Sequence, residues 1–332
     1  MTDRPARAGR RKRRVERGSG LYILWARMTT AFVFTGQGAQ FAGMGKDLCA
    51  WSKIAEQTLA EADRVLQAPI TRLCFEGPDQ DLALTENTQP CTLAVSIAAY
   101  RALGRQPDLA AGHSLGEYSA LCAAGALTFA DALQLVRERA RRMQQAVPVG
   151  TGAMVALLGK TTAEAQELCA TIRSGVCEIA NLNCPGQIVL AGEVAAMQEI
   201  VQLVGERRAR RLPVSVPFHC SLLQDAAAGF ATVLEATPMR DPAFPIWCNV
   251  DARPVLTAKA AKAALARQFA GAVLWQTSVE RMIQEAGCRR FIELGPKPIL
   301  LPMITKIAQG LGVSDVVTAP GTTAQELAAL AG

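Results

Sequence analysis

The sequence predicts an α/β protein whose chain is interrupted by a smaller module of different texture. From Thr30 onward, short apolar runs of strand length alternate with longer segments of helical periodicity, the pattern of a sheet covered by helices. Between Pro148 and Pro217 the order of expected elements changes to strand, helix, strand, strand, helix, strand. That order is typical of a ferredoxin-like module, so we expect such a module to be inserted into an α/β core.

The core elements follow one another from the start of this alternation. A first strand over 31–34 runs into the glycine-rich turn Thr35-Gly-Gln-Gly-Ala-Gln40. A short strand near 109–111 runs into Gly112-His-Ser-Leu-Gly116, and a helix is expected from Glu117 onward. Further helical patterns lie around 51–66, 90–103 and 129–145. The second turn is therefore expected to connect a strand directly to a helix.

The inserted module is expected to span 151–213. Pro148-Val-Gly-Thr-Gly152 has the composition of a hinge. Beyond it we expect strands over 153–158, 178–181, 187–191 and 211–216, and helices over 163–172 and 194–203. The core would then comprise 29–150 and 214–315, because α/β character resumes after Pro217. The last residues, 316–332, are expected to form a C-terminal tail.

The positive charge of the chain is concentrated at its start. Residues 1–28 hold nine Lys and Arg side chains against Asp3 and Glu16, a net charge of +7, whereas the whole chain carries +6 and the remainder therefore −1. The segment has no helical period and no apolar face, so we expect it to be disordered. A nucleic-acid arm, a targeting peptide and an upstream extension with Met28 as the true start are open interpretations, the last being favoured. No nucleic-acid partner is expected for the near-neutral body.

Hydropathy and cysteine usage favour a cytoplasmic protein without membrane association. No run reaches the roughly 18 apolar residues of a membrane span, and 21–25 falls short of the about 7–15 residues of a secretory h-region. The ten cysteines include no CxxC pair, and most lie in apolar surroundings. Buried or free thiols in a reducing compartment are therefore expected, and no metal site.

The segment Gly112-His-Ser-Leu-Gly116 matches the G-x-S-x-G pattern of a nucleophile elbow. In such an elbow the serine occupies a tight turn between strand and helix, with glycines where a side chain would clash. The hydroxyl of Ser114 would project at the N-terminus of the following helix. There the helix dipole and the free N–H of Leu115 can stabilise an oxyanion. The pattern thus predicts a serine nucleophile.

A serine nucleophile needs a base, and the chain holds two histidines, His113 and His219. The ring of His113 is not expected to reach back across a sharp elbow to Ser114. His219 is therefore the candidate base, and a satisfied core histidine is the alternative interpretation. Asp131 is the one aspartate between Ser114 and His219, and it belongs to a helix start. We therefore predict a Ser–His dyad whose imidazole is oriented by a group such as a main-chain carbonyl.

The arginine-rich segment Val136-Arg-Glu-Arg-Ala-Arg-Arg142 is mostly a solvated helix face. A single guanidinium of this segment that pointed inward would form a bidentate clamp for a carboxylate. Periodicity alone does not tell which arginine that is.

Five motifs stand in one order across about residues 30 to 305: Phe34-Thr-Gly-Gln-Gly-Ala-Gln40, Gly112-His-Ser-Leu-Gly-Glu-Tyr-Ser119, Gly150-Thr-Gly-Ala-Met154, Asn183-Cys-Pro-Gly-Gln187 and Val214-Ser-Val-Pro-Phe-His-Cys220. In order and spacing they resemble the malonyl-CoA:acyl-carrier-protein transacylases of dissociated fatty-acid synthesis, which are related to polyketide synthase acyltransferase domains. The resemblance implies an α/β-hydrolase-like core interrupted by a ferredoxin-like subdomain, in agreement with the element order above.

The resemblance also implies roles for individual residues. Ser114 would be the acylated nucleophile and His219 its base. Gln37 and the Leu115 amide would form the oxyanion hole. Arg139, 25 residues after the serine, would pair with the malonyl carboxylate.

Two further positions follow from the same resemblance. Gln268 falls where the family offers a main-chain carbonyl to the histidine. Phe218 departs from the serine that bacterial members often have before His219, and a bulky residue there goes with malonyl rather than methylmalonyl in polyketide relatives. An acyl pocket that selects malonyl is therefore expected. Glu293-Leu-Gly-Pro-Lys-Pro298 also departs from the family's glycine-rich version, and no function is attached to it.

The implied activity is transfer of malonyl from malonyl-CoA to the phosphopantetheine thiol of acyl carrier protein, by a ping-pong mechanism through a malonyl-Ser114 intermediate, in fatty-acid synthesis. No cofactor is implied, and a monomer is expected. Carrier proteins are acidic, so a basic docking rim is expected. Its candidate residues are Arg207, Arg208, Arg210 and Arg211, with Arg289 and Arg290 as further candidates.

Other functions share parts of this pattern. A serine hydrolase or thioesterase has the elbow and the dyad but does not need a carboxylate clamp. A carrier-binding scaffold without catalysis is disfavoured because Ser114, His219, Gln37 and Arg139 are all present. Among free-standing malonyl loaders, polyketide synthesis and malonate decarboxylase are open alternatives to fatty-acid synthesis, because the carrier lies outside the sequence.

Overall fold

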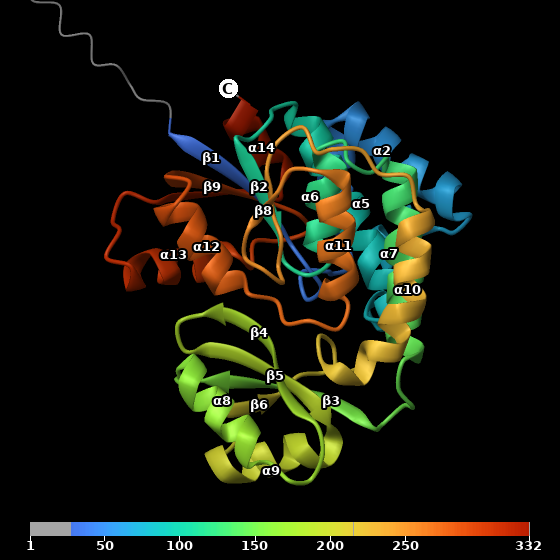
Figure 1. Cartoon of the computed structure of the whole chain (residues 1–332). Coiled ribbons are helices and arrows are strands. Elements are labelled where there is room, and N and C mark those ends of the chain that lie inside the picture. The colour runs from blue at the N-terminus through green and yellow to red at the C-terminus, as the bar shows by residue number, and fades with distance from the viewer. Residues whose placement is uncertain (1–27, 215, 332) are drawn as a thin grey trace, which may run out of the picture.

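The structure, a computed structural model, describes residues 28–214 and 216–331 of the chain. The basic extension predicted over 1–28 lies outside the described residues, except for Met28. Figure 1 shows a larger α/β body and, beside it, a smaller sheet flanked by two helices. No helix within the described ranges combines the length and the hydropathy that crossing a bilayer requires.

A six-stranded sheet forms the centre of the larger body, in the order β10-β9-β1-β2-β7-β8. All neighbouring strands are parallel except β7 and β8. The strands span Thr29–Phe34 (β1), Leu109–Gly112 (β2), Ile246–Trp247 (β7), Pro254–Val255 (β8), Cys288–Leu294 (β9) and Val317–Gly321 (β10). Because β1 and β2 are paired with Phe34 opposite Gly112, the turns that follow them leave the same edge of the sheet side by side.

Helices cover both faces of the sheet, and the alternation of side chains along β1 separates the two layers. Phe32 and Phe34 join the larger apolar cluster, whereas Ala31 and Val33 join the smaller one. The smaller cluster is covered by α12 (Trp275–Gln284) and α13 (Leu301–Gly310). The larger cluster is covered by α1 (Lys46–Trp51), α2 (Lys53–Leu66), α3 (Ile70–Glu76), α4 (Asp79–Leu82), α5 (Thr85–Leu103), α6 (Gly116–Ala123), α7 (Phe129–Gln145), α10 (Gln224–Ala236, after the short 3₁₀ turn Ser221–Leu223), α11 (Ala258–Gln268) and α14 (Ala324–Ala331).

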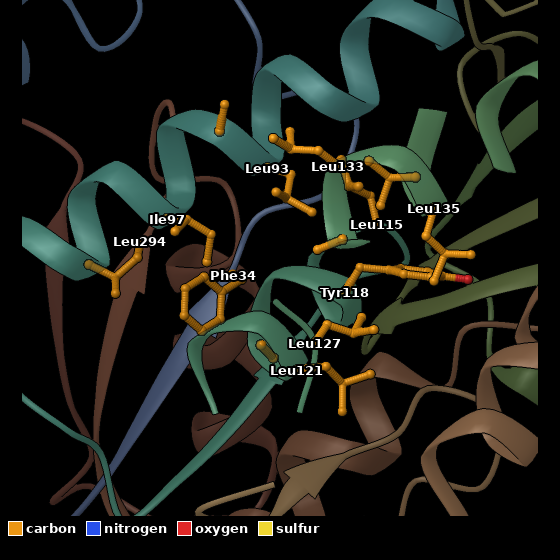
Figure 2. Close-up of a cluster of buried hydrophobic side chains, with 14 of the residues drawn as sticks. Phe34, Leu93, Ile97, Leu115, Tyr118, Leu121, Leu127, Leu133, Leu135 and Leu294 are labelled. Atoms are coloured by element: carbon orange, nitrogen blue, oxygen red, sulfur yellow. The ribbon is translucent and has the colours of Figure 1, made fainter. Parts of the chain in front are cut away.

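The larger cluster anchors the turn that follows β2. Figure 2 shows Leu115 and Tyr118 among buried side chains that include Phe34, Leu93 and Leu133. Leu115 and Tyr118 are 1% and 0% exposed. The residue directly after Ser114 is thus held by core packing, and α6 starts from a fixed point.

The predicted ferredoxin-like module is confirmed. Its strands pair antiparallel in the order β4-β5-β3-β6. The chain order is β3 (Gly152–Leu158), α8 (Thr162–Thr171), β4 (Cys177–Cys184), β5 (Gln187–Glu193), α9 (Val194–Val204) and β6 (Ala209–Arg211). The module has an apolar cluster of its own, formed by side chains such as Val155, Leu190 and Ile200. Because the module has a separate core, its order of strands and helices differs from that of the flanking segments.

Two expectations need correction. The tail expected over 316–332 is folded as far as the structure describes it: β10 pairs with β9 at the edge of the core sheet, and Leu327 of α14 is fully buried. The strand expected over 211–216 is instead the shorter β6, which ends at Arg211. In both cases the local pattern was short, and pairing with a distant strand decided where the element lies. All ten cysteines are free.

Candidate active site

Ser114 occupies a strained turn between β2 and α6. Its φ is +51°, in the left-handed region that residues other than glycine rarely adopt. A Cβ on Gly116 would lie 2.1 Å from the Phe34 carbonyl oxygen, so only glycine lets α6 start this close to β1. The Ser114 N–H donates to Asn249 Oδ1 at 2.7 Å, and Gln268 Nε2 donates to the Ser114 carbonyl at 2.9 Å. Hydrogen bonds on both sides of the residue thus hold a conformation that costs about 1–3 kcal/mol.

The imidazole of His219 faces the serine. Its Nε2 lies 2.7 Å from Ser114 Oγ, and its Nδ1 lies 3.0 Å from the main-chain oxygens of both Gln268 and Gly271. Both oxygens are acceptors, so Nδ1 carries the proton and Nε2 accepts the serine hydroxyl. Asp131 is not part of this arrangement, because its carboxylate accepts from Thr128 at the start of α7. The structure therefore places together a Ser–His dyad oriented by main-chain carbonyls.

His219 is held neutral. Burial lowers its pKa to about 3, and the positive charge of Arg139 contributes in the same direction. The other histidine, His113, turns away from the serine: its Nε2 lies 2.9 Å from Asn183 Oδ1 on β4 of the small module. This contact joins the elbow to the module, and it agrees with the expectation that His113 does not reach Ser114.

Arg139 is the arginine of α7 that points inward, and its side chain is 1% exposed. Its Nη2 donates to Ser114 Oγ at 3.1 Å and to Gln268 Oε1 at 3.0 Å, and its Nη1 donates to Gln89 Oε1 at 2.9 Å. The guanidinium also stacks 5.2 Å from the ring centroid of Tyr118. All of these partners are neutral. Burial lowers the pKa of Arg139 from its ordinary value, yet a guanidinium remains charged at neutral pH.

The Arg139 charge has no acidic counterpart in direct contact. No Asp or Glu of residues 28–214 and 216–331 forms an ion pair with it, and its buried Nε has no hydrogen-bond partner within these ranges. The neighbouring Arg141 and Arg142, by contrast, pair with Glu138. A buried, unpaired cation beside a serine hydroxyl is an arrangement suited to receive an anionic ligand.

The two candidate oxyanion donors lie on adjacent turns. Leu115 stands at the N-terminus of α6, and the described residues offer no acceptor for its N–H. Gln37 is half-buried in the turn after β1. A Cβ on the preceding Gly36 would lie 2.4 Å from the His113 carbonyl oxygen, so this turn packs directly against the elbow. The turn therefore brings Gln37 next to the segment that carries Ser114.

The sequence did not identify the Gly271 carbonyl of the site, nor the side chains of Gln89, Asn249 and Glu117. Gln89 on α5 and Asn249 after β7 stand outside every motif, so no local signal marked them. Glu117 directly follows the elbow and lies within the motif of residues 112–119, and it is 1% exposed. Its Oε2 accepts from the Asn249 N–H and from Gln268 Nε2, both at 2.9 Å, and burial raises its pKa to about 7.

The remaining predicted residues lie further out. Phe218 is half-buried and packs against the larger core cluster directly before His219. Arg289 pairs with Asp315, which makes it less available to a partner. Arg290, on β9, is only half-buried, so it is not an exposed docking residue. The remaining candidates for docking, Arg207, Arg208, Arg210 and Arg211 around β6, are exposed and form no ion pair within the described ranges.

The fold and the site define an acyltransferase. The family described as acyl transferase domain matches residues 31–326, which include the core and the inserted module. Sequence and structure relatives narrow this class. A malonyl CoA-acyl carrier protein transacylase of Bacillus subtilis (strain 168) is 42% identical over 300 residues, covering 87% of this chain and 94% of that protein.

Solved structures agree with this likeness. An acyl-carrier-protein S-malonyltransferase from Burkholderia pseudomallei 1710b is 40% identical with a TM-score of 0.86, covering 91% of this chain and 99% of that one. A malonyl-transacylase solved in complex with its type II PKS acyl-carrier protein is 38% identical with a TM-score of 0.86, covering 91% of this chain and 98% of that one. The chain belongs to the family of malonyl CoA-acyl carrier protein transacylases.

Proposed function

We propose that the protein transfers malonyl from malonyl-CoA to the phosphopantetheine thiol of an acyl carrier protein through a malonyl ester of Ser114. The observation that carries the proposal is the buried guanidinium of Arg139, which touches the Ser114 hydroxyl and lacks an acidic partner within the described residues. In malonyl-CoA one methylene separates the carboxylate from the thioester carbonyl. A carbonyl carbon in reach of Ser114 therefore brings the carboxylate into reach of Arg139.

In the first half-reaction Ser114 Oγ attacks the thioester carbonyl, and its proton passes to His219 Nε2. The Leu115 N–H and Gln37 stabilise the tetrahedral oxyanion. When this intermediate collapses, the carbon–sulfur bond breaks and coenzyme A leaves with the proton from His219. The malonyl ester of Ser114 remains, with its carboxylate on Arg139.

In the second half-reaction the phosphopantetheine thiol of the carrier replaces coenzyme A. His219 takes the thiol proton as the sulfur attacks the ester carbonyl, and it returns a proton to Ser114 as the ester bond breaks. The carbonyls of Gln268 and Gly271 accept from Nδ1 in both protonation states, so the ring keeps its orientation through the cycle. Malonyl-CoA and the carrier thiol use one site in turn, which is a ping-pong mechanism.

The carrier is proposed to dock on the exposed arginines around β6, because acidic carrier proteins complement a basic surface. Fatty-acid synthesis is the proposed pathway. The likeness to a malonyl-transacylase solved with a type II PKS acyl-carrier protein supports polyketide synthesis as the second candidate. Rates of discharge by a fatty-acid carrier and by a polyketide carrier, compared at equal concentration, distinguish the two pathways.

The proposed function is tested by intact-mass measurement. Brief exposure of the protein to malonyl-CoA is expected to add one malonyl group, whereas acetyl-CoA gives little adduct. Addition of phosphopantetheinylated acyl carrier protein is then expected to remove the malonyl group from the enzyme and place it on the carrier. Absence of an adduct with either donor contradicts the proposal. Free malonate in place of malonyl-carrier would identify a thioesterase.

The pH dependence of acylation is expected to reflect the environment of His219. A histidine pKa lowered to about 3 leaves the imidazole neutral, so the acylation rate of the free enzyme should not fall between about pH 8 and about pH 5. Arg139→Gln removes one cause of the lowered His219 pKa. The pH at which acylation by this variant falls on the acid side should therefore be higher than in the wild type. Single-turnover acylation, with tryptophan fluorescence as a control for folding, measures both profiles. A wild-type midpoint near the ordinary histidine value of about 6.5 contradicts the expectation.

A further inference from the structure

We propose that Glu117 is a positioning residue for acyl transfer: one carboxylate oxygen fixes Gln268 and Asn249, the two side chains that hold the main chain of Ser114 from both sides. The inference rests on the proposed role of Ser114 as the nucleophile. Glu117 itself does not touch the reacting atoms. It lies one helical turn after Ser114 on α6, is 1% exposed, and its N–H donates to the Ser114 carbonyl at 3.2 Å.

The Glu117 carboxylate decides how the Gln268 amide is oriented. Gln268 Nε2 donates to Glu117 Oε2 and to the Ser114 carbonyl, both at 2.9 Å, and more weakly to Asn249 Oδ1 at 3.3 Å, which leaves neither N–H group free. Its Oε1 must then face the opposite way, where it accepts from Arg139 Nη2 at 3.0 Å. The reverse orientation would place N–H groups against a guanidinium, which has only donors, and an amide oxygen against a carboxylate. Glu117 and Arg139 together allow only one orientation of the Gln268 side-chain amide.

The same oxygen of Glu117 positions Asn249. It accepts from the Asn249 main-chain N–H at 2.9 Å, and this sets the side chain between two groups of the elbow. Asn249 Oδ1 accepts from the Ser114 N–H at 2.7 Å, and its Nδ2 donates to the Gly112 carbonyl at 2.7 Å. Both peptide groups that flank the strained Ser114 therefore depend on side chains that Glu117 holds.

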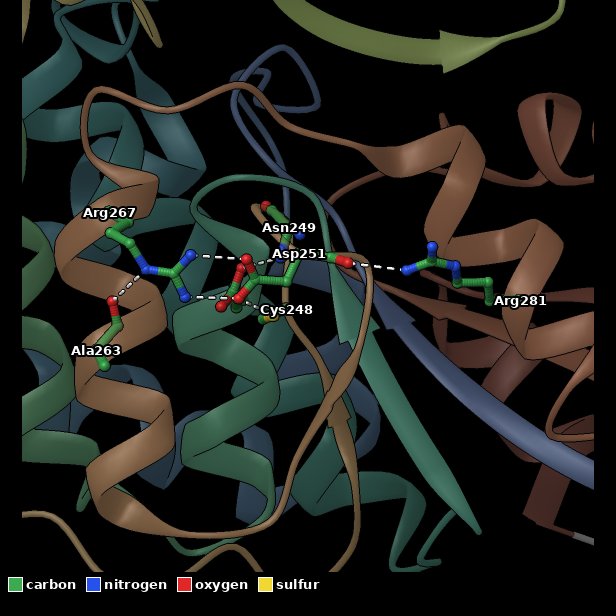
Figure 3. A network of polar contacts seen from close by, with 7 residues as sticks. Cys248, Asn249, Asp251, Ala263, Arg267 and Arg281 are labelled. Carbon is green, nitrogen blue, oxygen red and sulfur yellow. Dashed lines mark hydrogen bonds and ion pairs between the residues drawn. The ribbon is translucent and has the colours of Figure 1, made fainter.

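An ion pair at the surface joins the same two segments. Figure 3 shows Asp251, in the loop of Asn249, facing Arg267, the residue before Gln268 on α11. Arg267 donates to both Asp251 oxygens, at 2.6 and 2.5 Å, and Arg281 donates to the Asp251 carbonyl at 2.9 Å. The pair is half-exposed and adds little free energy by itself. Its effect is to fix the spacing between the Asn249 loop and the end of α11. Glu117 then joins the same two segments from the buried side.

The consequence for the reaction is a change in the position of Ser114 Oγ relative to His219 Nε2. Gln268 presents its main-chain oxygen to His219 Nδ1 and its side-chain oxygen to Arg139. A loosened Gln268 or Asn249 would shift Ser114 Oγ away from His219 Nε2, which now lies 2.7 Å away. A misplacement of about 1 Å costs on the order of 100-fold in rate. The substrate carboxylate would still meet Arg139, which keeps Gln89 and Tyr118 as neighbours.

The test compares Glu117→Ala with Glu117→Gln in single-turnover acylation by malonyl-CoA, followed by intact mass. Glu117→Ala is expected to lower the maximal acylation rate by about 30- to 100-fold, with the half-saturating malonyl-CoA concentration within about threefold of wild type. The glutamine variant keeps an amide oxygen that can accept both N–H groups, and it is expected to recover most of the rate. Glu293→Ala is the matched control: it removes an equally buried carboxylate, which holds the N-terminus of α13 instead. It should lower thermal stability without slowing acylation.

The outcomes separate this inference from the proposed function. Labelling of Ser114 by a fluorophosphonate reports how the serine is positioned, independently of malonyl. A wild type that labels but takes up no malonyl overturns the proposed function, and the labelling rates of the variants still decide the role of Glu117. A wild-type acylation rate in Glu117→Ala overturns the inference. The inference is also overturned if Glu117→Gln acylates as slowly as Glu117→Ala. If Glu117→Ala does not fold, Glu117→Asp replaces it in the test, because its carboxylate is withdrawn by one methylene. Glu117→Asp should lower the acylation rate at an unchanged half-saturating malonyl-CoA concentration. A wild-type acylation rate in this variant also overturns the inference.

Discussion

Ser114→Ala is expected to form no malonyl adduct, and His219→Ala is expected to slow adduct formation by about 10⁴-fold. The serine supplies the oxygen of the ester, so no other residue replaces it. Without the imidazole, the hydroxyl has Arg139 as a neighbour, which donates hydrogen bonds and accepts no proton. Intact mass after timed exposure to malonyl-CoA measures both variants. The double variant should be no slower than Ser114→Ala, because the two residues act as one unit.

Matched controls exist for both members of the dyad. Ser119 is a buried serine on the same helix, five residues further on, and Ser119→Ala should acylate at the wild-type rate. His113 is the other histidine, and His113→Gln should keep acylation within about tenfold because its ring faces Asn183. An adduct on Ser114→Ala would show that another residue is acylated. Full activity of His219→Ala would show that the serine ionises without this base.

Arg139→Ala is expected to reverse the choice of donor. Breaking a buried charge pair by removal of one partner costs about 3–5 kcal/mol, which corresponds to a loss of roughly 10²- to 10³-fold or more in acylation by malonyl-CoA. Acetyl-CoA brings no carboxylate, so it gains nothing from the guanidinium and should acylate the variant at least as fast as wild type. Pocket size contributes only about 1–3 kcal/mol per methylene. Competition between the two donors, with the adducts resolved by mass, measures the ratio.

Arg141→Ala is the matched control for this change. Arg141 lies on the same helix, its side chain is 56% exposed, and it pairs with Glu138. Its removal should leave the ratio of malonyl to acetyl adduct unchanged. A preference for malonyl that survives in Arg139→Ala would mean that selectivity resides elsewhere, for example in the packing around Phe218.

Elements with a complete pattern could be predicted from the sequence. The helix expected over 129–145 is α7, Phe129–Gln145, because Thr128 caps its N-terminus and its apolar face is regular. The strands β3 and β5 begin within one residue of the predicted ones. The failures are short elements. The edge strand β10 and the three-residue β6 have too few residues to show a period, and pairing with the distant strands β9 and β3 places them.

The candidate site divides in the same way. Ser114 and His219 were found because a turn motif and the small number of histidines are properties of the chain itself. Asn249 and Gln89 carry no such mark, since an asparagine or glutamine becomes part of a site only through what lies opposite to it. The side chain of Gln268, which contacts Arg139, Glu117 and Ser114, is a similar case. The sequence led only to its main-chain oxygen.

By itself the sequence determined the class of fold and the family, and it pointed to Ser114 and His219 as candidate nucleophile and base. These inferences depend on local motifs, on their order along the chain and on the small number of histidines. The tertiary structure alone decided which arginine of α7 turns inward and that no acidic side chain of the described residues meets it. It also decided that Glu117 joins the segments of Asn249 and Gln268, which are separated from it by 132 and 151 residues. The physical reason is that a buried charge or amide gains its role from partners brought together by the packing of distant elements, and local periodicity does not contain those partners.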